Sequence, residues 1–382
     1  MIANAINKMF EKYFKKGTID LDYSYIESIP ELMKLKGCEQ TPRWHKEGNA
    51  WNHTLLVTDQ MKKQIGNETD LNTARLLMMA ALFHDIGKGE TTEFKNGDWH
   101  SYNHDVVGEK IARRVLWNEG IPNRERVCKL IRMHMEIAGF RKAKDAIGKC
   151  ARIVANMRES SYNKVACDWL IKLIKADEYG SISDEESREK DLELIGRMES
   201  IMLPLSDLYW SPEIRRNLFH NEPIDKMIEG LPVVTVMVGL PGSGKNTYIE
   251  RFLPARADVL SRDDIRVELG MCGQGEKFVG TREQEEVVTR IFDMRLEELA
   301  KDGKDIVINN INLVRKYRDE LRKKLNAYDY AFHYVYCEAP TIEDNFRRRR
   351  GMISEDIILA MTEKFDFPTC DEYDYLRYYI SG

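Results

Sequence analysis

Residues 233–248 read VVTVMVGLPGSGKNTY, and this stretch decides the fold of the second half of the chain. A short, mostly β-branched apolar run leads into a glycine-rich turn with one lysine, which is typical of a buried parallel strand, a phosphate-binding loop and a helix. The glycines let backbone N–H groups close on phosphate oxygens, and the helix directs its positive end at the same anion. We therefore expect a nucleotide to bind Gly239, Pro241, Gly242, Ser243, Gly244, Lys245, Asn246 and Thr247.

Within this loop, Lys245 is expected to reach the β- and γ-phosphates. Asn246 stands where a serine or threonine usually helps to hold Mg²⁺, and Thr247 follows one place later. An amide oxygen can itself ligate Mg²⁺ or hold one of its waters. The sequence thus predicts a nucleoside triphosphate with Mg²⁺ and leaves ATP or GTP open; an ordinary glycine turn is the alternative.

Downstream and around this loop, strand patterns alternate with helical ones. The predicted strands are Val233–Val238, Asp258–Leu260, Asp305–Ile308 and Phe332–Tyr336, and the predicted helices are Lys245–Phe252, Arg282–Leu299, Val314–Leu325, Ile342–Arg349 and one after Ser354. This alternation predicts an α/β domain with a parallel sheet covered on both faces and a helical lid. Ligands of such sheets bind beyond the carboxyl ends of the strands.

Polar residues follow two of these strands. Asp263, after the second strand, can accept a proton from an attacking hydroxyl, and Arg266 lies one turn further on, where it can grip a phosphate of the acceptor. The third strand ends in Asn309-Asn310-Ile311-Asn312, for which acceptor binding through Asn312 and ordinary turn chemistry are both open.

Four consecutive arginines, residues 347–350, precede Gly351. A solvated helix end is the usual interpretation of such a run. Phosphoryl transfer needs cationic stabilisation, however, so we favour a lid that brings Arg350, or as second choice Arg347, to the transferred phosphate.

The segments G-L-P-G-S-G-K, S-R-D-D-I-R and N-x-N-L, followed by the arginine run, resemble the polynucleotide 5′-kinase family over nearly all of residues 231–365. That resemblance implies that Asp263 is the general base on a 5′-hydroxyl, that Arg266 binds the acceptor phosphate, and that Lys245 and Arg350 stabilise the γ-phosphoryl group. Asn310 replaces an aspartate often found in the family, so the mode of Mg²⁺ binding stays open.

The first half of the chain is helical in pattern and shows no strand-like alternation of any length, so we expect an all-α bundle there. Apolar residues recur at helical spacing in Trp51–Ile65, Leu71–Phe83, Val106–Trp117, Arg124–Met135 and Val165–Ala176. Histidines and carboxylates fall near the ends of these helices. Ligands of this kind suit Mn²⁺, Fe, Co²⁺, Ni²⁺ or Zn²⁺. We expect His45 and His100 to be ordinary surface or hydrogen-bonded histidines.

The order N-H-T, H-D-I-G-K, H-D, a helix-end histidine and an aspartate resembles the HD phosphohydrolase family, and residues 43–54 look like the HD domain of bacterial tRNA nucleotidyltransferases. The resemblance implies one or two metal ions that activate water against phosphoesters. The first metal would be held by His53, His84, Asp85 and Asp177; His104 and His134 match a second site, and Lys88 would contact phosphate.

Together the halves resemble the bacterial HD-Pnk family over essentially the whole chain, with an HD phosphohydrolase domain at 1–225 and a kinase domain at 226–382. The resemblance implies healing of RNA ends, with DNA ends left open, and a separate RNA ligase as partner. Two alternatives remain: a salvage hydrolase fused to a small-metabolite kinase, and an HD hydrolase regulated by an ATP switch.

Composition is typical of a soluble globular protein. The chain has 382 residues, 43% of them hydrophobic and 32% charged, and its net charge of −5 gives no overall nucleic-acid signature. Seven scattered cysteines without a C-x-x-C pair suit a reducing cytoplasm. Residues 1–16 lack the apolar core of a signal peptide, and no run is long enough to span a membrane, so we expect a cytoplasmic protein with no membrane partner.

Overall fold

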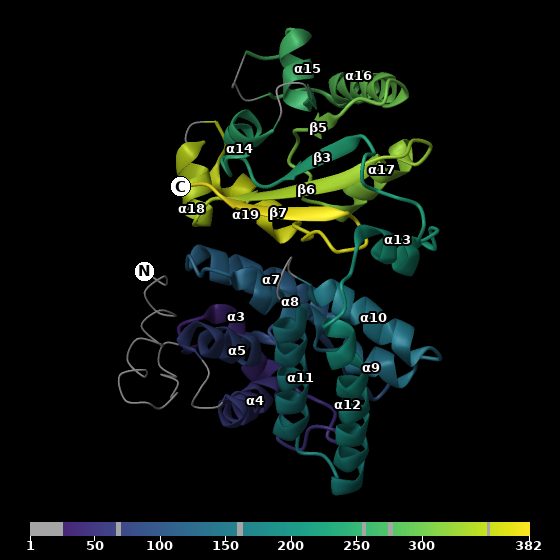
Figure 1. Ribbon diagram of the computed structural model, residues 1–382. Helices are drawn as coiled ribbons and strands as arrows, with labels where there is room; N and C mark the ends of the chain where they lie inside the picture. The colour runs from purple at the N-terminus through teal and green to yellow at the C-terminus, as the bar shows by residue number, and fades with distance from the viewer. Residues whose placement is uncertain (1–25, 66–69, 159–162, 254–256, 274–277, 350–351) are drawn as a thin grey trace. The chain divides into compact units, whose positions relative to one another are not determined.

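The computed structural model describes residues 26–65, 70–158, 163–253, 257–273, 278–349 and 352–382. The stretch interpreted as lacking a signal peptide, residues 1–16, lies outside them. The chain divides into two compact units, Met1–Tyr209 and Trp210–Gly382 (Figure 1). Among the helices of the described residues, none is long and apolar enough to cross a lipid bilayer.

The first unit is a helical domain, as predicted. Its helices are α3 (Pro30–Met33), η2 (Lys34–Gly37), α4 (Ala50–Gln64), α5 (Leu71–Phe83), α6 (Lys88–Thr91), α7 (His104–Asn118), α8 (Arg124–Met133), α9 (Glu136–Arg141), α10 (Ala146–Met157), α11 (Asn163–Gly180) and α12 (Glu185–Ser206). Polar caps set several starts: the Asp70 carboxylate, for example, accepts hydrogen bonds from the backbone N–H groups of Asn72 and Thr73. Helix α5 is almost wholly apolar and lies in the core, packed against α4, α8 and α11.

One element in this unit departs from the all-α expectation. Strands β1 (Thr92–Lys95) and β2 (Asp98–Ser101) form a two-stranded antiparallel hairpin between α6 and α7. Its turn is Asn96-Gly97, and both residues have positive φ, 54° and 81°. Asn-Gly with positive φ at both positions is the preferred two-residue hairpin turn. The dipeptide was therefore a local signal for the hairpin, although each strand is too short to show alternation.

The second unit contains a five-stranded, wholly parallel sheet, which confirms the predicted α/β fold. The strand order is β4 (Asp258–Leu260), β5 (Ile306–Ile308), β3 (Val233–Val238), β6 (Ala331–Glu338) and β7 (Tyr375–Ile380). The helices are α13 (Pro212–His220), α14 (Lys245–Phe252), α15 (Arg262–Glu268), α16 (Arg282–Lys301), α17 (Arg315–Leu325), α18 (Ile342–Arg348) and α19 (Glu355–Glu363). Strand β7, at the edge of the sheet, was not predicted.

Both faces of this sheet are covered. On one face, Met237 of β3 packs with Val335 and Cys337 of β6 against Tyr248 of α14. On the other face, the ring of Tyr336 packs on the rings that follow α19, those of Phe365 and Phe367. Strand β3 is the central strand of the sheet, between β5 and β6. Its carboxyl end therefore lies at the centre of the side of the sheet where ligands of such folds bind.

Helix α13 belongs to the second unit, so the compact units divide earlier than the boundary expected at residue 225. The guanidinium of Arg216 donates to Asp374 Oδ1 at 2.8 Å and Oδ2 at 2.6 Å, and to the carbonyl of Tyr330 at 2.6 Å. Arg216 and Asp374 are both buried. A buried charge pair of this kind is costly to break, and it fixes α13 to the segment that leads into β7.

Candidate active sites

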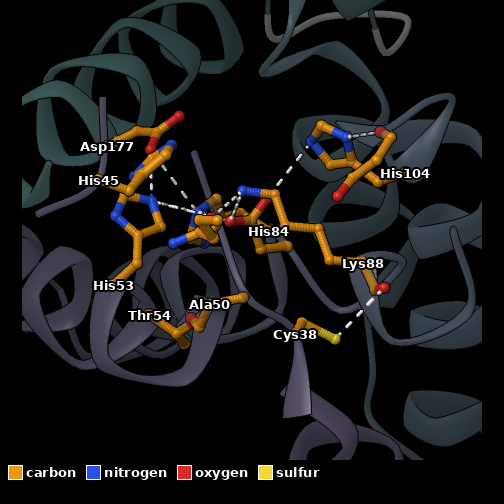
Figure 2. Close-up of polar contacts among 12 residues, drawn as sticks. Cys38, His45, Ala50, His53, Thr54, His84, Lys88, His104 and Asp177 are labelled. Carbon is orange, nitrogen blue, oxygen red and sulfur yellow. Dashed lines mark hydrogen bonds and ion pairs between the residues drawn. The ribbon is translucent and has the colours of Figure 1, made fainter. Parts of the chain in front are cut away.

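The predicted metal ligands of the first unit lie at helix ends that converge. His53 lies in the first turn of α4, His84 and Asp85 directly follow α5, and Asp177 lies in the last turn of α11. His104 is the first residue of α7, and His134 follows the last residue of α8. Figure 2 shows the side chains of His53, His84 and Asp177 turned toward one another, with His104 and Lys88 further along the same cluster.

The first group of ligands is closely spaced. His53 Nε2 lies 2.9 Å from Asp177 Oδ1 and 3.4 Å from His84 Nε2. Asp85 Oδ2 is 3.3 Å from His84 Nε2 and 3.7 Å from His53 Nε2. His53, His84 and Asp85 are buried and bring one ligand atom each into a group that could hold a metal ion. The four residues predicted for the first metal are thus brought together.

A second group shares Asp85 with the first. His104 Nε2 is 3.2 Å from His134 Nε2, and these atoms lie 3.3 and 3.9 Å from Asp85 Oδ1. These three residues also form a group that could hold a metal ion. One oxygen of Asp85 therefore faces the first histidine pair and the other oxygen faces the second pair, as a carboxylate between two metals would.

The imidazoles are oriented by hydrogen bonds on their far nitrogens. The Nδ1 atoms of His84, His104 and His134 lie 2.8, 2.7 and 2.6 Å from the carbonyl oxygens of residues 81, 101 and 131. A carbonyl only accepts, so each Nδ1 must carry the proton and donate it. Each Nε2 then keeps a lone pair directed into the cluster, which is the tautomer that a metal ligand needs.

Glu47 performs the same task for His53, and the sequence analysis missed it. Its Oε1 lies 3.0 Å from His53 Nδ1 and 2.7 Å from His45 Nδ1, and its Oε2 accepts from the backbone N–H of Ile182 at 2.9 Å. Burial alone would raise the pKa of Glu47, but these hydrogen bonds hold it well below its usual range. Its position two residues after His45 gave no local signal. His45 is a hydrogen-bonded histidine, as expected.

Charge in the cluster is divided unequally. Burial would lower the pKa of His53, yet Asp177 and Glu47 raise it to about 9. Burial and the neighbouring His104 and His84 lower the pKa of His134 to about 4. The carboxylates beside His53 therefore favour its protonated form, whereas His134 stays neutral at physiological pH and has the lone pair that a metal ligand needs. At His53 a divalent ion would have to take the place of the proton on Nε2.

Lys88 lies inside the cluster rather than at its rim. Its Nζ is 2.7 Å from Asp85 Oδ2 and donates to Gln40 Oε1, also at 2.7 Å. The side chain is buried. Asp85 Oδ2 accepts no hydrogen bond of good geometry. The oxygen is nevertheless ion-paired with Lys88, so the fit to a metal rests on the donor set: two buried carboxylate oxygens among converging Nε2 atoms are ligands that divalent cations take, and the residues present are suited to the metal that the sequence predicts.

A glycine allows the second group to approach Asp85. A Cβ on Gly87 would lie 2.0 Å from the carbonyl oxygen of His104 and 2.6 Å from the amide of Gly108. Any side chain there would push α7 away from the turn after Asp85. The H-D-I-G order is thus explained by packing, because only glycine lets the two halves of the cluster meet.

The second unit forms the predicted phosphate loop between β3 and α14. Lys245 Nζ donates to the carbonyls of Gly239 and Leu240, both at 2.9 Å, and so curls across the loop. Gly242 has φ +79°, and a Cβ there would lie 2.6 Å from the carbonyl of Asn345. Burial, with the nearby charge of Arg349, lowers the pKa of Lys245 to about 8.

Asn246, the unusual residue of the loop, has a partner. Its Oδ1 accepts from Asn309 Nδ2 at 3.0 Å, which joins the start of α14 to the end of β5. Asn310 Oδ1 accepts from the backbone N–H of Arg262 at 3.0 Å and so supports the start of α15. Asn312 Nδ2 donates to the carbonyl of Met237 at 2.8 Å, which ties the segment after β5 to β3.

Asp263 and Arg266 lie together on α15. Asp263 is exposed, with 88% of its side chain accessible, and its Oδ1 accepts from Arg266 Nη1. Glu285 of α16, which the sequence analysis missed, accepts from Arg266 Nε and Nη2, both at 3.0 Å. The guanidinium of Arg266 is fixed beside the exposed carboxylate of Asp263. In this arrangement the guanidinium can bind an acceptor phosphate while the carboxylate accepts a hydrogen bond from a hydroxyl group.

The described arginines of this run have different surroundings. Arg350 lies outside the described residues, and Arg347 pairs with Asp344 at the surface. Arg348 Nη1 donates to the Gly242 carbonyl of the phosphate loop at 3.2 Å. Arg349 is near enough to affect the pKa of Lys245. The structure thus places Arg348 and Arg349, neither of them predicted, beside the loop.

Comparisons with known proteins match the two halves of the chain to two different domain families. Residues 51–157 match the HD domain family and residues 234–368 match the AAA domain family. The chain is 33% identical over 96 residues to a Multifunctional CCA protein of Vibrio parahaemolyticus, and 41% identical over 87 residues to one of Actinobacillus pleuropneumoniae. These matches cover 25% and 23% of this chain, but only 21% and 20% of the relatives' length.

A crystal structure described as that of a kinase from Chloroflexus aurantiacus is similar to part of this chain. The likeness covers 39% of this chain and 88% of the kinase chain, with 16% sequence identity and a TM-score of 0.31. That likeness is too distant to bear on function. The family matches and the fold together show an HD helical domain followed by a P-loop kinase domain with a parallel five-stranded sheet.

Proposed function

We propose that the protein heals broken RNA ends with both units. The second unit phosphorylates a 5′-hydroxyl end from ATP or GTP. The first unit opens a 2′,3′-cyclic phosphate or removes a terminal 2′- or 3′-phosphate. The observation that carries the proposal is the Asp263–Arg266 pair beside the phosphate loop, in a chain that also holds the Asp85-centred cluster.

In the kinase reaction, Asp263 accepts the proton of the 5′-hydroxyl as its oxygen attacks the γ-phosphorus. The bond to the β–γ bridging oxygen breaks, and the nucleoside diphosphate leaves. Arg266 holds the acceptor by a phosphate beyond the reacting hydroxyl, which is why its presence favours a polynucleotide over a free nucleoside. Lys245 stabilises the charge on the transferred group, with Arg350 as the predicted lid residue.

In the hydrolase reaction, His53, His84, Asp85 and Asp177 would hold one divalent ion, and His104, His134 and Asp85 a second. Such ions supply Lewis acidity and an activated water for phosphoester hydrolysis. The carbonyls behind His84, His104 and His134 keep each Nε2 directed inward, and Glu47 does so for His53. Lys88, close to Asp85, is the residue we assign to a phosphate oxygen of the substrate.

The test uses an RNA with a 5′-hydroxyl and a 2′,3′-cyclic phosphate, incubated with Mn²⁺ or Ni²⁺ and each NTP in turn, after which both ends are analysed. We expect a 5′-phosphate and an opened or removed terminal phosphate. Equal or better phosphorylation of a free nucleoside would instead favour the salvage alternative. NTP hydrolysis without transfer, which also survives Asp263→Ala, would favour an ATP switch.

If the protein heals RNA ends as we propose, a separate RNA ligase would join them.

A further inference from the structure

The hairpin β1–β2 is inserted between ligands of the two metal groups. Asp85 is followed by α6, the hairpin, and then His104. The second strand ends at Ser101, whose carbonyl accepts from His104 Nδ1 at 2.7 Å. The hairpin is therefore joined to the cluster through the hydrogen bond that fixes one of the ligands.

Side-chain contacts hold the hairpin in place. Thr41 Oγ1 lies 2.8 Å from Asp98 Oδ1 and 3.1 Å from the carbonyl of Trp99, and Thr92 Oγ1 lies 2.8 Å from Ser101 Oγ. These contacts lie at both ends of the two strands. The hairpin thus presents its remaining side chains from a fixed position beside the cluster.

Two aromatic pairs occur here, one across the two strands and one between β2 and the turn that follows it. Phe94 and Trp99 face each other across the strands, with ring centroids 5.1 Å apart in a T-shaped arrangement. Cross-strand aromatic pairs of this kind stabilise a hairpin. Tyr102 lies beyond the last strand pair, so it contributes nothing to cross-strand packing.

Tyr102 nevertheless lies flat on a second ring. Its centroid is 5.1 Å from that of His100, the ring planes differ by only 9°, and Oη lies 3.3 Å from His100 Nδ1. The tyrosine is 61% exposed. One face of the ring is thus partly covered by the offset imidazole, while much of the side chain is open to solvent. Tyr102 also lies only two residues from His104, which limits their Cα separation to about 7.6 Å.

We propose that Tyr102, backed by His100, is a stacking platform for the nucleobase of the RNA end whose phosphate is hydrolysed in the Asp85-centred cluster. This inference rests on the proposed function of that cluster and adds the group that recognises its substrate. Every base offers a π-face, so such a platform binds RNA ends without regard to sequence. It would also give the hydrolytic cluster a preference for nucleotides over other phosphoesters.

A nucleobase suits this place better than a protein side chain does. The platform is a single ring pair beside the phosphoester cluster, whereas protein interfaces need a broad, well-packed surface. A base attached to the reacting phosphate would reach a neighbouring ring through its own ribose. The stacked geometry of Tyr102 on His100 would simply be extended by one more ring.

The first experiment compares two oligonucleotides that share the same terminal 2′,3′-cyclic phosphate, one with a terminal base and one with an abasic terminal ribose. Tyr102→Ala should raise KM for the first about tenfold and leave KM for the second unchanged. Tyr102→Trp should retain the low KM. Phe94→Ala, the matched control on the same hairpin, should affect both substrates alike. An equal effect of Tyr102→Ala on both substrates, or none on either, would overturn the proposal.

A binding experiment separates this inference from the proposed function. An oligonucleotide with 2-aminopurine at its 3′ end should lose fluorescence on binding the full-length protein, because stacking quenches that base, and Tyr102→Ala should restore the signal. If the protein hydrolyses no RNA end but still quenches through Tyr102, the proposed reaction is wrong and the platform stands. If it hydrolyses RNA ends without quenching in any variant, the platform is wrong and the reaction stands.

Discussion

Glu285 holds Arg266 through both of its carboxylate oxygens, each at 3.0 Å from a different guanidinium nitrogen. This leaves the Nη1 edge of the arginine toward Asp263. Glu285 thus sets the direction of the group that we assign to the acceptor phosphate, although it belongs to a different helix. Bidentate pairs of this kind fix geometry as well as contributing energy.

Loss of Glu285 should therefore impair acceptor binding and spare the nucleotide. We expect Glu285→Ala to raise KM for a 5′-hydroxyl oligonucleotide about tenfold, with little change in KM for the NTP, and Glu285→Gln to be milder. Glu268→Ala is the matched control, because Glu268 pairs with Arg295 across the same two helices without touching Arg266. An increase in the NTP KM alone would contradict this role.

The two activities should be separable by substitution. Asp263→Ala should abolish transfer to a 5′-hydroxyl while hydrolysis of terminal phosphate continues at the wild-type rate, since Asp263 lies in the other unit. The double substitution His84→Ala and Asp85→Ala should do the reverse. Both ends of one RNA substrate, analysed in the same reaction, check this. Loss of both activities in either variant would show that the units depend on each other.

The kinase should lose nucleotide affinity at mildly alkaline pH. The pKa of Lys245 is lowered to about 8, so the side chain is charged below this pH and becomes neutral above it. We expect KM for the NTP to be constant below about pH 8 and to rise above it, as Lys245 of the unliganded enzyme loses its proton. In Lys245→Arg the rise should disappear, whatever the rate, because a guanidinium stays charged. An unchanged profile in that variant would assign the titration to another group.

Metal content should report the shared position of Asp85. We expect the wild-type protein to bind two Mn²⁺ per chain, and the variant His104→Ala, His134→Ala to bind one, as counted by calorimetry or elemental analysis. Asp85→Ala should weaken both sites, because each of its oxygens faces a different histidine pair. A wild-type content of one ion, unchanged in the double variant, would limit the cluster to the first group.

The buried ion pair between Arg318 and Glu372 should matter greatly for stability. Arg318 Nε donates to Glu372 Oε2 at 2.7 Å, and both residues are buried. Removing one partner leaves an uncompensated buried charge, which costs about 3–5 kcal/mol. We expect Arg318→Ala to lower the free energy of unfolding of the second unit by that amount in a denaturant titration. Lys316→Ala, an exposed position on the same helix, should change it little.

Much of this structure is predictable because its signals are local. The apolar run of β3 and the apolar residues of Leu71–Phe83 each determine an element within a few residues, and both elements match the predicted bounds. The candidate metal ligands were identifiable because their order along the chain is distinctive. Local signals of this kind do not depend on the distant parts of the chain.

The missed features depend on long-range contacts. Strand β7 is recognisable only through its pairing with β6, because an edge strand is partly exposed and its residues alternate weakly. Glu285 and Glu47 are ordinary acidic residues in sequence, and their tasks come from where Arg266 and His53 lie in space. The hairpin was different, since Asn96-Gly97 did mark it.

The attachment of α13 to the sheet unit bears on how such a gene could be rearranged. Arg216 neutralises the buried carboxylate of Asp374. A coding segment for the sheet therefore encodes all the partners of its buried charges only if it begins upstream of α13. A recombination point placed after α13 would transfer Asp374 without its counter-charge. Shuffling of this kinase module among proteins should therefore preserve the join near residue 210, and exchanges that cut between α13 and β3 should be selected against.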